Sequence, residues 1–159
     1  MKTIPILSAL LALAALPALA DPTAEAKAHS EAFARAMNTR DAKAMLALYA
    51  DDARVIWPGE GEEASGRQAI EKLIASTLAT LPKDARIALK SQQAIPLGAN
   101  YIATVGRWEQ SATGPDGKKE ISEVRTTEVL EKRGGKTLYL VDHASAGVPP
   151  PPPPAPSAR

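Results

Sequence analysis

The sequence predicts an α+β domain in which three N-terminal helices pack against one face of a strongly curved antiparallel sheet. Apolar residues recur with a helical period of about 3.6 up to Pro82, and with a period of about 2 from Asp84 onward. The later segments are separated by short turns rich in Gly, Asn and Asp, which favour antiparallel hairpins. A block of helices followed by a block of strands is typical of α+β domains.

The first 20 residues have the features of a cleavable export signal. Lys2 precedes an apolar run, which ends at Pro17 and the small residues around Ala20. This run is shorter than the roughly 20 residues that cross a bilayer, so we expect no stable membrane insertion after removal of the signal. We therefore predict an exported protein, periplasmic or secreted, with a folded domain at 21–148.

The composition excludes several classes of function. Lysine and arginine number 19 against 18 acidic residues, and loss of Lys2 with the signal leaves a formal charge of zero, so we predict no nucleic-acid partner. The chain has no cysteine, which excludes disulfides and a thiol nucleophile. Its two histidines are far apart in the sequence and it has no Gly-rich phosphate loop, so we predict neither a metal site nor a cofactor.

The first two helices have recognisable start signals. Asp21 and Pro22 favour the start of a helix that we expect to end near Asn38. Its apolar stripe consists of Ala26, Phe33, Ala34 and Met37. Asp41 is a typical capping residue for a second helix, which we predict to end at Asp51–Asp52. That helix presents Met45, Leu46, Leu48 and Tyr49.

A short strand and a third helix follow. Residues 54–57 are predicted to form the strand, and the Gly- and Glu-rich segment 59–63 an exposed loop. Ser65 and Gln68 have the spacing of a capping box, and the helix that they begin should end at Pro82.

The remainder is predicted to form four longer strands and a tail. The strands are expected at 86–95, 101–111, 119–131 and 137–145. Gly106 is expected to mark a bend in the second of them. The proline-rich segment 149–159 cannot pack into a core, and we expect it to be a disordered, polyproline-like tail.

Charged residues interrupt strands that should contribute to the core. Glu128 lies among apolar neighbours, and Asp142 and His143 follow an apolar run. Strand alternation directs about half of such residues inward, where charged groups must pair or line a wet cavity. The alternative is an exposed edge strand or outer face, and the pattern alone leaves both readings open.

Several segments resemble a known superfamily. The runs YADDARV at 49–55, Trp57-Pro58 and SGRQAI at 65–70 resemble the nuclear transport factor 2-like superfamily, particularly SnoaL-like proteins and ketosteroid isomerase. The runs TEVLEKR at 127–133 and DHAS at 142–145 are similar to the association domain of calmodulin-dependent kinase II. The resemblance covers about 23–147. It implies a cone-shaped fold, with a bent antiparallel sheet and three helices around a mostly apolar pocket, and a homodimer formed through the outer sheet face.

Of three functional positions in ketosteroid isomerase, only one has a chemically suitable residue in this sequence. The resemblance puts Trp57 where that family has its general-base Asp, and Phe33 where it has an oxyanion-hole Tyr. Glu128 falls on the position of a carboxylic acid that donates a hydrogen bond. With one suitable group in three positions, steroid isomerisation is not implied.

The resemblance also suggests which residues line the pocket. Asp142 points inward in the simplest register, but a β-bulge would direct His143 inward instead, so both remain candidates. We favour Trp108 over Arg107 and Glu109 as the inward residue of its strand. The candidate pocket set is Phe33, Tyr49, Trp57, Trp108, Glu128, Leu140, Asp142 and Ala144.

Three functions remain open. The first is an exported protein that binds a small apolar or aromatic molecule without catalysis. The second is an acid-base enzyme, such as an isomerase, cyclase, dehydratase or hydrolase, with catalytic candidates Glu128, Asp142 and His143. The third is an oligomerisation module with a vestigial pocket.

Overall fold

The computed structural model describes residues 21–58 and 63–147. The predicted export signal at 1–20, the predicted tail at 149–159 and residues 59–62 of the predicted loop lie outside the described residues. Within the two described ranges, no helix combines the length and the apolar character of a membrane span.

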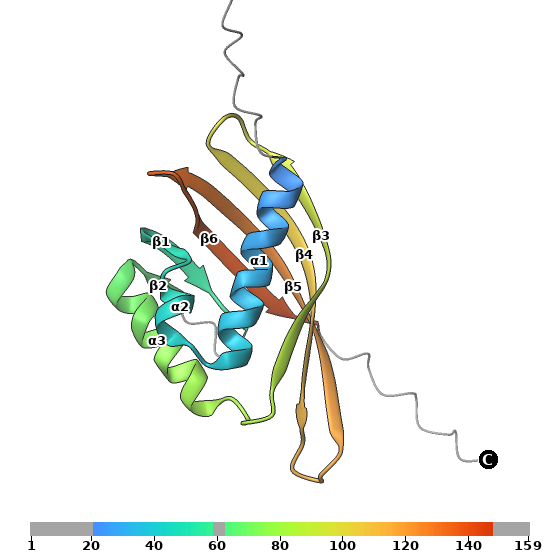
Figure 1. Ribbon diagram of the computed structural model, residues 1–159. Coiled ribbons are helices and arrows are strands. Elements are labelled where there is room, and N and C mark those ends of the chain that lie inside the picture. Colours follow the sequence, from blue (N-terminus) through green and yellow to red (C-terminus); the bar gives the residue numbers. More distant parts are fainter. Residues whose placement is uncertain (1–20, 59–62, 148–159) are drawn as a thin grey trace, which may run out of the picture.

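The described residues form helices on one strongly curved sheet, which confirms the predicted α+β fold (Figure 1). The helices are α1 (Pro22–Thr39), α2 (Ala42–Leu46) and α3 (Arg67–Thr80). The strands are β1 (Tyr49–Ile56), β2 (Glu63–Ser65), β3 (Arg86–Pro96), β4 (Tyr101–Thr113), β5 (Lys119–Arg133) and β6 (Lys136–Ala146). The described strands form one sheet with the order β2-β1-β6-β5-β4-β3.

One strand pair departs from the predicted antiparallel arrangement. The successive pairs from β3 to β6 are antiparallel, as is the β1–β2 pair, but β1 runs parallel to β6. The sheet is therefore mixed. Turn chemistry identified the hairpins because their partners are adjacent in sequence, whereas β1 and β6 are separated by most of the chain.

The second predicted helix is shorter than expected. It ends at Leu46, and Tyr49 already belongs to β1, so the prediction of a helix to Asp51–Asp52 is wrong. The backbone N–H of Tyr139 donates to the carbonyl of Leu48 at 2.8 Å. Pairing with β6 thus begins where the sequence still reads as helix, an example of tertiary contacts overriding local propensity.

The start of the third helix also differs. Its N-cap is Gly66, with φ of 78° and no side-chain capping bond, so the predicted capping box of Ser65 and Gln68 does not form. Ser65 instead ends β2, which pairs with β1 through Arg54 and Ser65. Part of the predicted loop, Glu63 onward, is therefore a strand.

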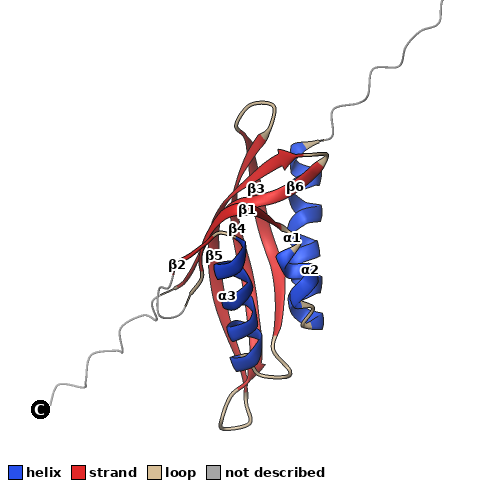
Figure 2. Cartoon of the chain, turned by 90° about the vertical axis from the view of Figure 1, so that its left-hand side faces the viewer, coloured by secondary structure: helices blue, strands red, loops and turns tan. Residues whose placement is uncertain are grey.

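The helices cover different parts of the same sheet (Figures 1 and 2). α1 packs along β3, while α3 packs against β1 and β2 at the other side. The core between them includes fully buried Met45, Val55, Ile70, Ile74, Ile102, Leu130 and Tyr139. Because the helices diverge over a curved sheet, their facing sides can enclose a cavity.

The outer face of the sheet carries exposed apolar side chains. Val105 is 49% exposed and Val141 is 37% exposed, and Ile56 lies on the same sheet with 38% exposure. The resemblance places a dimer interface on the outer face, and the homodimer stays a prediction.

Arg40 links the end of α1 to the end of α3. Its backbone is in the left-handed region, with φ of 57°, where it forms the C-cap of α1. Its guanidinium donates to the carbonyls of Leu78 at 2.6 Å, Leu81 at 2.7 Å and Pro82 at 2.6 Å. Favourable charge at a helix C-terminus adds to these bonds. The side chain therefore stabilises the relative position of the two helices.

We predict that Arg40→Ala lowers the free energy of unfolding by about 2 kcal/mol, because the hydrogen bonds from a charged donor are lost. Arg40→Gly should lose about 1 kcal/mol less than Arg40→Ala, since glycine adopts positive φ without strain. Urea denaturation measures both, with exposed Arg35→Ala on α1 as the control. Wild-type stability of Arg40→Ala would contradict the proposed link.

Candidate functional site

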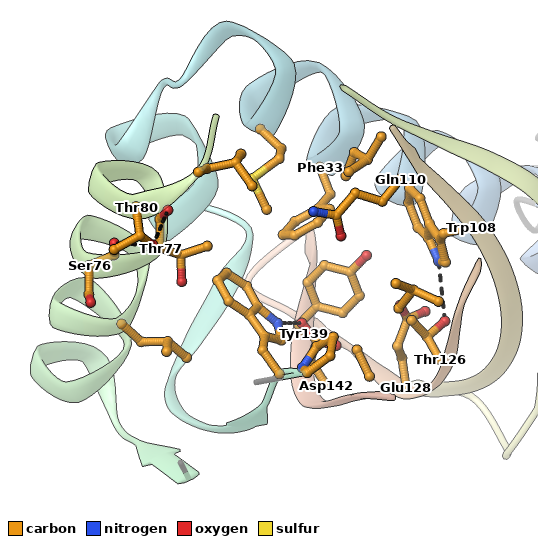
Figure 3. Close-up of a pocket in the computed structure, with 18 of the residues that line it drawn as sticks. Phe33, Ser76, Thr77, Thr80, Trp108, Gln110, Thr126, Glu128, Tyr139 and Asp142 are labelled. Carbon is orange, nitrogen blue, oxygen red and sulfur yellow. Dashed lines mark hydrogen bonds between the residues drawn. The ribbon is translucent and has the colours of Figure 1, made fainter. Parts of the chain in front are cut away.

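A cavity of about 560 Å³ lies between the helices and the inner face of the sheet (Figure 3). This volume lies in the usual range of small-molecule sites. Side chains from α1, α3, β3, β4, β5, β6 and the end of β1 line it. Its lining includes Phe33, Met37, Trp57, Leu73, Thr77, Ile87, Trp108, Gln110, Thr126, Glu128, Tyr139, Asp142 and Ala144.

Aromatic rings form the apolar part of the lining. The ring of Phe33 lies at the centre of the group, with centroid distances of 5.9 Å to Trp57, 6.1 Å to Trp108 and 6.0 Å to Tyr139. All three contacts are edge-to-face, the arrangement that the ring quadrupoles favour. Phe33 reaches the cavity from α1, and its partners come from β4, β6 and the residue that follows β1, so helix and sheet together hold this group in place.

The carboxylate of Asp142 is buried in the cavity wall, with 4% of the residue exposed. The hydroxyl of Tyr49 donates to its Oδ2 at 2.6 Å, and the indole N–H of Trp57 donates to the same atom at 2.8 Å. Across residues 21–58 and 63–147, no side-chain donor reaches Oδ1. One oxygen is thus stabilised by two donors, and the other keeps its full capacity to accept.

Glu128 lies directly opposite Asp142 on the neighbouring strand. Only 2% of Glu128 is exposed, and the hydroxyl of Thr104 hydrogen-bonds to its Oε2. Residues paired across antiparallel strands have Cβ atoms about 4.5–5.5 Å apart. Two acidic side chains therefore share one small apolar region, and their protonation is coupled.

The environment raises the pKa of both acids. Burial, followed by the charge of Asp142, raises the pKa of Glu128 to about 7, while hydrogen bonds from Thr104 and Thr126 act in the opposite direction. Burial also raises the pKa of Asp142, against the hydrogen bonds from Tyr49 and Trp57, which favour its charged form. The pair is therefore able to retain one proton near neutral pH.

A tight contact positions the second indole. The indole N–H of Trp108 on β4 donates to the hydroxyl of Thr126 on β5 at 3.3 Å. Gly106, also on β4, is paired with Thr126 and lies beside this hydrogen bond. A Cβ atom at Gly106 would lie 2.6 Å from the Thr126 hydroxyl oxygen and 3.1 Å from Trp108 Nε1. Glycine is required here because any side chain would collide with this hydrogen bond.

The side formed by α3 is more polar. Ser76, Thr77 and Thr80 line the cavity from this helix, opposite Glu128 and Asp142 on the sheet (Figure 3). The Thr80 hydroxyl donates to carbonyls within its own helix. The amide of Gln110 points into the cavity from β4 (Figure 3). Polar groups therefore lie on both sides of the aromatic cluster.

The structure brings together most of the predicted pocket residues, with two departures. Phe33, Trp57, Trp108, Glu128, Asp142 and Ala144 line the cavity. Tyr49 lies behind Asp142, in contact with its carboxylate rather than in the lining. Leu140, also predicted for the pocket, is not in the lining either; it is partly buried and packs against the hydrophobic core.

A β-bulge explains why Leu140 does not line the cavity and why Tyr139, which was not predicted to line it, does. Val129 pairs with Val141 and Leu130 with Tyr139, so Leu140 is the additional residue in β6. Tyr139 and Asp142 consequently both point inward, although their spacing is odd. His143, the alternative to Asp142, is exposed. Periodicity alone cannot reveal such a bulge, and Tyr139 was therefore missed.

Comparisons with known proteins agree with this fold. Residues 27–149 match the SnoaL-like domain family. Among curated proteins, none matches the chain. A solved structure from Xanthomonas campestris, named for the calcium/calmodulin dependent protein kinase II association domain, has a TM-score of 0.70 and 28% identity, covering 84% of this chain and 93% of that chain.

Two further solved structures are similar in fold. A ketosteroid isomerase-like protein from Erwinia carotovora atroseptica has a TM-score of 0.69 and 21% identity, covering 82% of this chain and 99% of that chain. A protein from Streptomyces avermitilis, named as a dehydratase of the NTF2-like family, has a TM-score of 0.70 and 17% identity, covering 80% and 97%. The matched region contains the complete curved sheet and the cavity, and the chain belongs to the SnoaL-like domain family.

Proposed function

We propose that this protein binds a small, flat and largely apolar molecule in the cavity, with Asp142 and Glu128 contacting its polar end. The observation that carries the proposal is the buried carboxylate pair beside an aromatic cluster in a cavity of about 560 Å³. Rings of Phe33, Trp57 and Trp108 suit the flat part of a ligand. The predicted export signal adds a location in the periplasm or outside the cell, on the strength of the sequence alone.

The energetic cost of the pair supports a binding role. Placing a carboxylate in an apolar environment costs several kcal/mol unless hydrogen bonds or an opposite charge compensate. Asp142 receives two hydrogen bonds on one oxygen, and its other oxygen lacks a donor among the residues that the structure describes. A ligand that donates to Oδ1 would complete the solvation of this group.

Acid-base catalysis is a second candidate, favoured by the different partners of the two acids. Tyr49 and Trp57 donate to Asp142, which stabilises its ionised form. The Thr104 hydroxyl next to Glu128 can donate or accept, so it tolerates a protonated Glu128. In such catalysis, Asp142 would act as the base and accept a proton from a carbon atom of the substrate. Glu128 would act as the acid and donate a proton to an oxygen atom of the substrate.

We predict that Ala144→Phe abolishes ligand binding by filling the cavity, because Ala144 lines it and is only 9% exposed. The matched control is Ser145→Phe, at the next and exposed position of β6. Trp57 and Trp108 are the chain's 2 tryptophans, so their fluorescence reports occupancy of the cavity. A panel of flat aromatic alcohols and amines should quench wild type and the control, but not Ala144→Phe. Absence of saturable quenching by the whole panel in wild type would reject ligand binding.

The catalytic candidate can be tested without knowing the natural substrate. 2-Tetralone is a largely flat, apolar ketone. The C–H protons next to its carbonyl exchange in D₂O when a base removes them while an acid donates a hydrogen bond to the carbonyl oxygen. We predict that Asp142→Asn and Glu128→Gln each reduce this exchange by a factor of about 100. Exposed Glu123→Gln, on the same strand as Glu128, is the control. Wild-type exchange no faster than in buffer, measured by NMR, would reject catalysis.

The shared proton has a consequence for stability. Between pH 4.5 and about 7, native Glu128 keeps a proton that the unfolded chain has released. Stability from this group therefore falls as the pH rises through that window. We predict that Glu128→Gln gains about 2 kcal/mol of unfolding free energy relative to wild type over the same window.

Urea denaturation at several pH values measures this difference. Glu123→Gln should show no comparable trend. The titration of His29, whose pKa burial lowers to about 4, contributes to wild type and variants alike and cancels in the comparison. A constant difference between Glu128→Gln and wild type would show that Glu128 is ionised throughout.

A further inference from the structure

The cavity lining contains two acidic side chains and, among the described residues, no basic one. Of the lining residues, Glu128 and Asp142 are ionisable acids, and no Lys, Arg or His lines the cavity in the described part of the chain. Both acids belong to neighbouring strands and point to the same side of the sheet. A negative charge on either acid therefore lies inside an apolar enclosure, where Coulomb interactions are stronger than in water.

In the described part of the chain, neither acid forms an ion pair with a basic side chain. Arg40 is committed to the carbonyls of Leu78, Leu81 and Pro82 at the end of α3. His29 on α1 packs edge-on against Tyr139, and burial lowers its pKa to about 4, so it is neutral at pH 7. His143 on β6 is exposed, next to Asp142 in sequence but on the opposite face of the strand.

The other titratable neighbours are phenols. Burial raises the pKa of Tyr49 from β1 and of Tyr139 from β6 well above the ordinary value, so both stay neutral. The polar groups of α3 and β4 that face the cavity, including Thr77 and Gln110, carry no charge. Among the described residues, no Lys, Arg or His lies beside the pair in the cavity, and the charge of His143 acts on Asp142 only from the other face of β6.

The aromatic lining adds to the attraction for a cation. Faces of Trp, Tyr and Phe bind ammonium groups through the ring quadrupole, with Trp the strongest. Trp57, Trp108, Phe33 and Tyr139 all contribute to this lining. A bound carboxylate or phosphate would meet the two acids and these negative ring faces, so anionic ligands are disfavoured.

We propose that the cavity binds an organic cation, namely a protonated amine on a flat apolar skeleton, whose nitrogen contacts Asp142 Oδ1 and the carboxyl group of Glu128. This inference rests on the proposed binding function and specifies its ligand class. An ammonium group supplies both the hydrogen bond that Oδ1 lacks and the positive charge that the pair lacks. The skeleton then lies among the rings of the aromatic cluster.

The test uses two sets of matched compounds in isothermal titration calorimetry at pH 7. The first set is 2-phenylethylamine, 2-phenylethanol and 3-phenylpropionate; the second is 1-naphthylmethylamine, 1-naphthalenemethanol and 1-naphthylacetate. In each set we expect the amine to bind about tenfold more tightly than the alcohol, and the carboxylate most weakly. Amine and alcohol share a skeleton, so their ratio isolates the contribution of the charge.

Variants locate the effect in the carboxylate pair. Asp142→Asn should remove most of the amine's advantage over the alcohol, and near-UV circular dichroism checks that the variant is folded. Exposed Asp52→Asn, whose wild-type carboxylate pairs with Arg133 outside the cavity, should keep the full advantage. In wild type, lowering the pH from 7 to 4.5 should weaken binding of the amine but not of the alcohol, since Glu128 gains a proton while the amine stays charged.

The outcomes separate the two proposals. Alcohols that bind as tightly as their amines, or carboxylates that bind best, would overturn the organic-cation inference and leave the binding function intact. Failure of all six compounds to bind would overturn the binding function itself. An unchanged amine advantage in Asp142→Asn would also reject the inference.

Discussion

The arrangement of the cavity depends on how one buried carboxylate is satisfied. Both donors to Asp142 are held by β1: Tyr49 begins this strand and Trp57 directly follows its end. β1 pairs in parallel with β6, the strand that carries Asp142. This pairing brings both donors to the carboxyl group, which needs hydrogen bonds because it is buried. The carboxylate is consequently a structural constraint as well as a chemical group.

That constraint explains why the interior is hollow at this point. A polar pair on the sheet cannot be covered by closely packed apolar side chains without losing its remaining hydrogen-bonding capacity. α1 and α3 cover different edges of the sheet, and the region between them over Glu128 and Asp142 stays open. Fully buried Ile70 and Ile74 on α3 lie outside this lining and pack in the hydrophobic core.

Sequence periodicity predicted the fold class, the first helix and the four hairpin strands well, because each is determined by local spacing and turn chemistry. It failed where long-range pairing decides. The apolar spacing around Tyr49 predicts a helix, yet Tyr49 pairs with β6 and belongs to β1. Leu140 is expected to line the pocket, yet a bulge at this residue leaves it outside the lining and places Tyr139 there. Asp142 and His143 stayed unresolved for the same reason, since one extra residue reverses the facing of a strand.

The substitution at Trp57 has a different meaning once the contacts are known. The resemblance puts this residue where ketosteroid isomerase has its base, which suggests that the acid was simply lost. In the structure, the Trp57 indole donates to Asp142, so the carboxylate is kept in the cavity on another strand. By donating to Asp142, the indole keeps a group that can accept a proton in the cavity. Its ring also enlarges the apolar lining. In the proposed function, Trp57 thus has two roles: it lines the cavity beside the flat part of the ligand, and its N–H positions the carboxyl group that contacts the ligand's polar end.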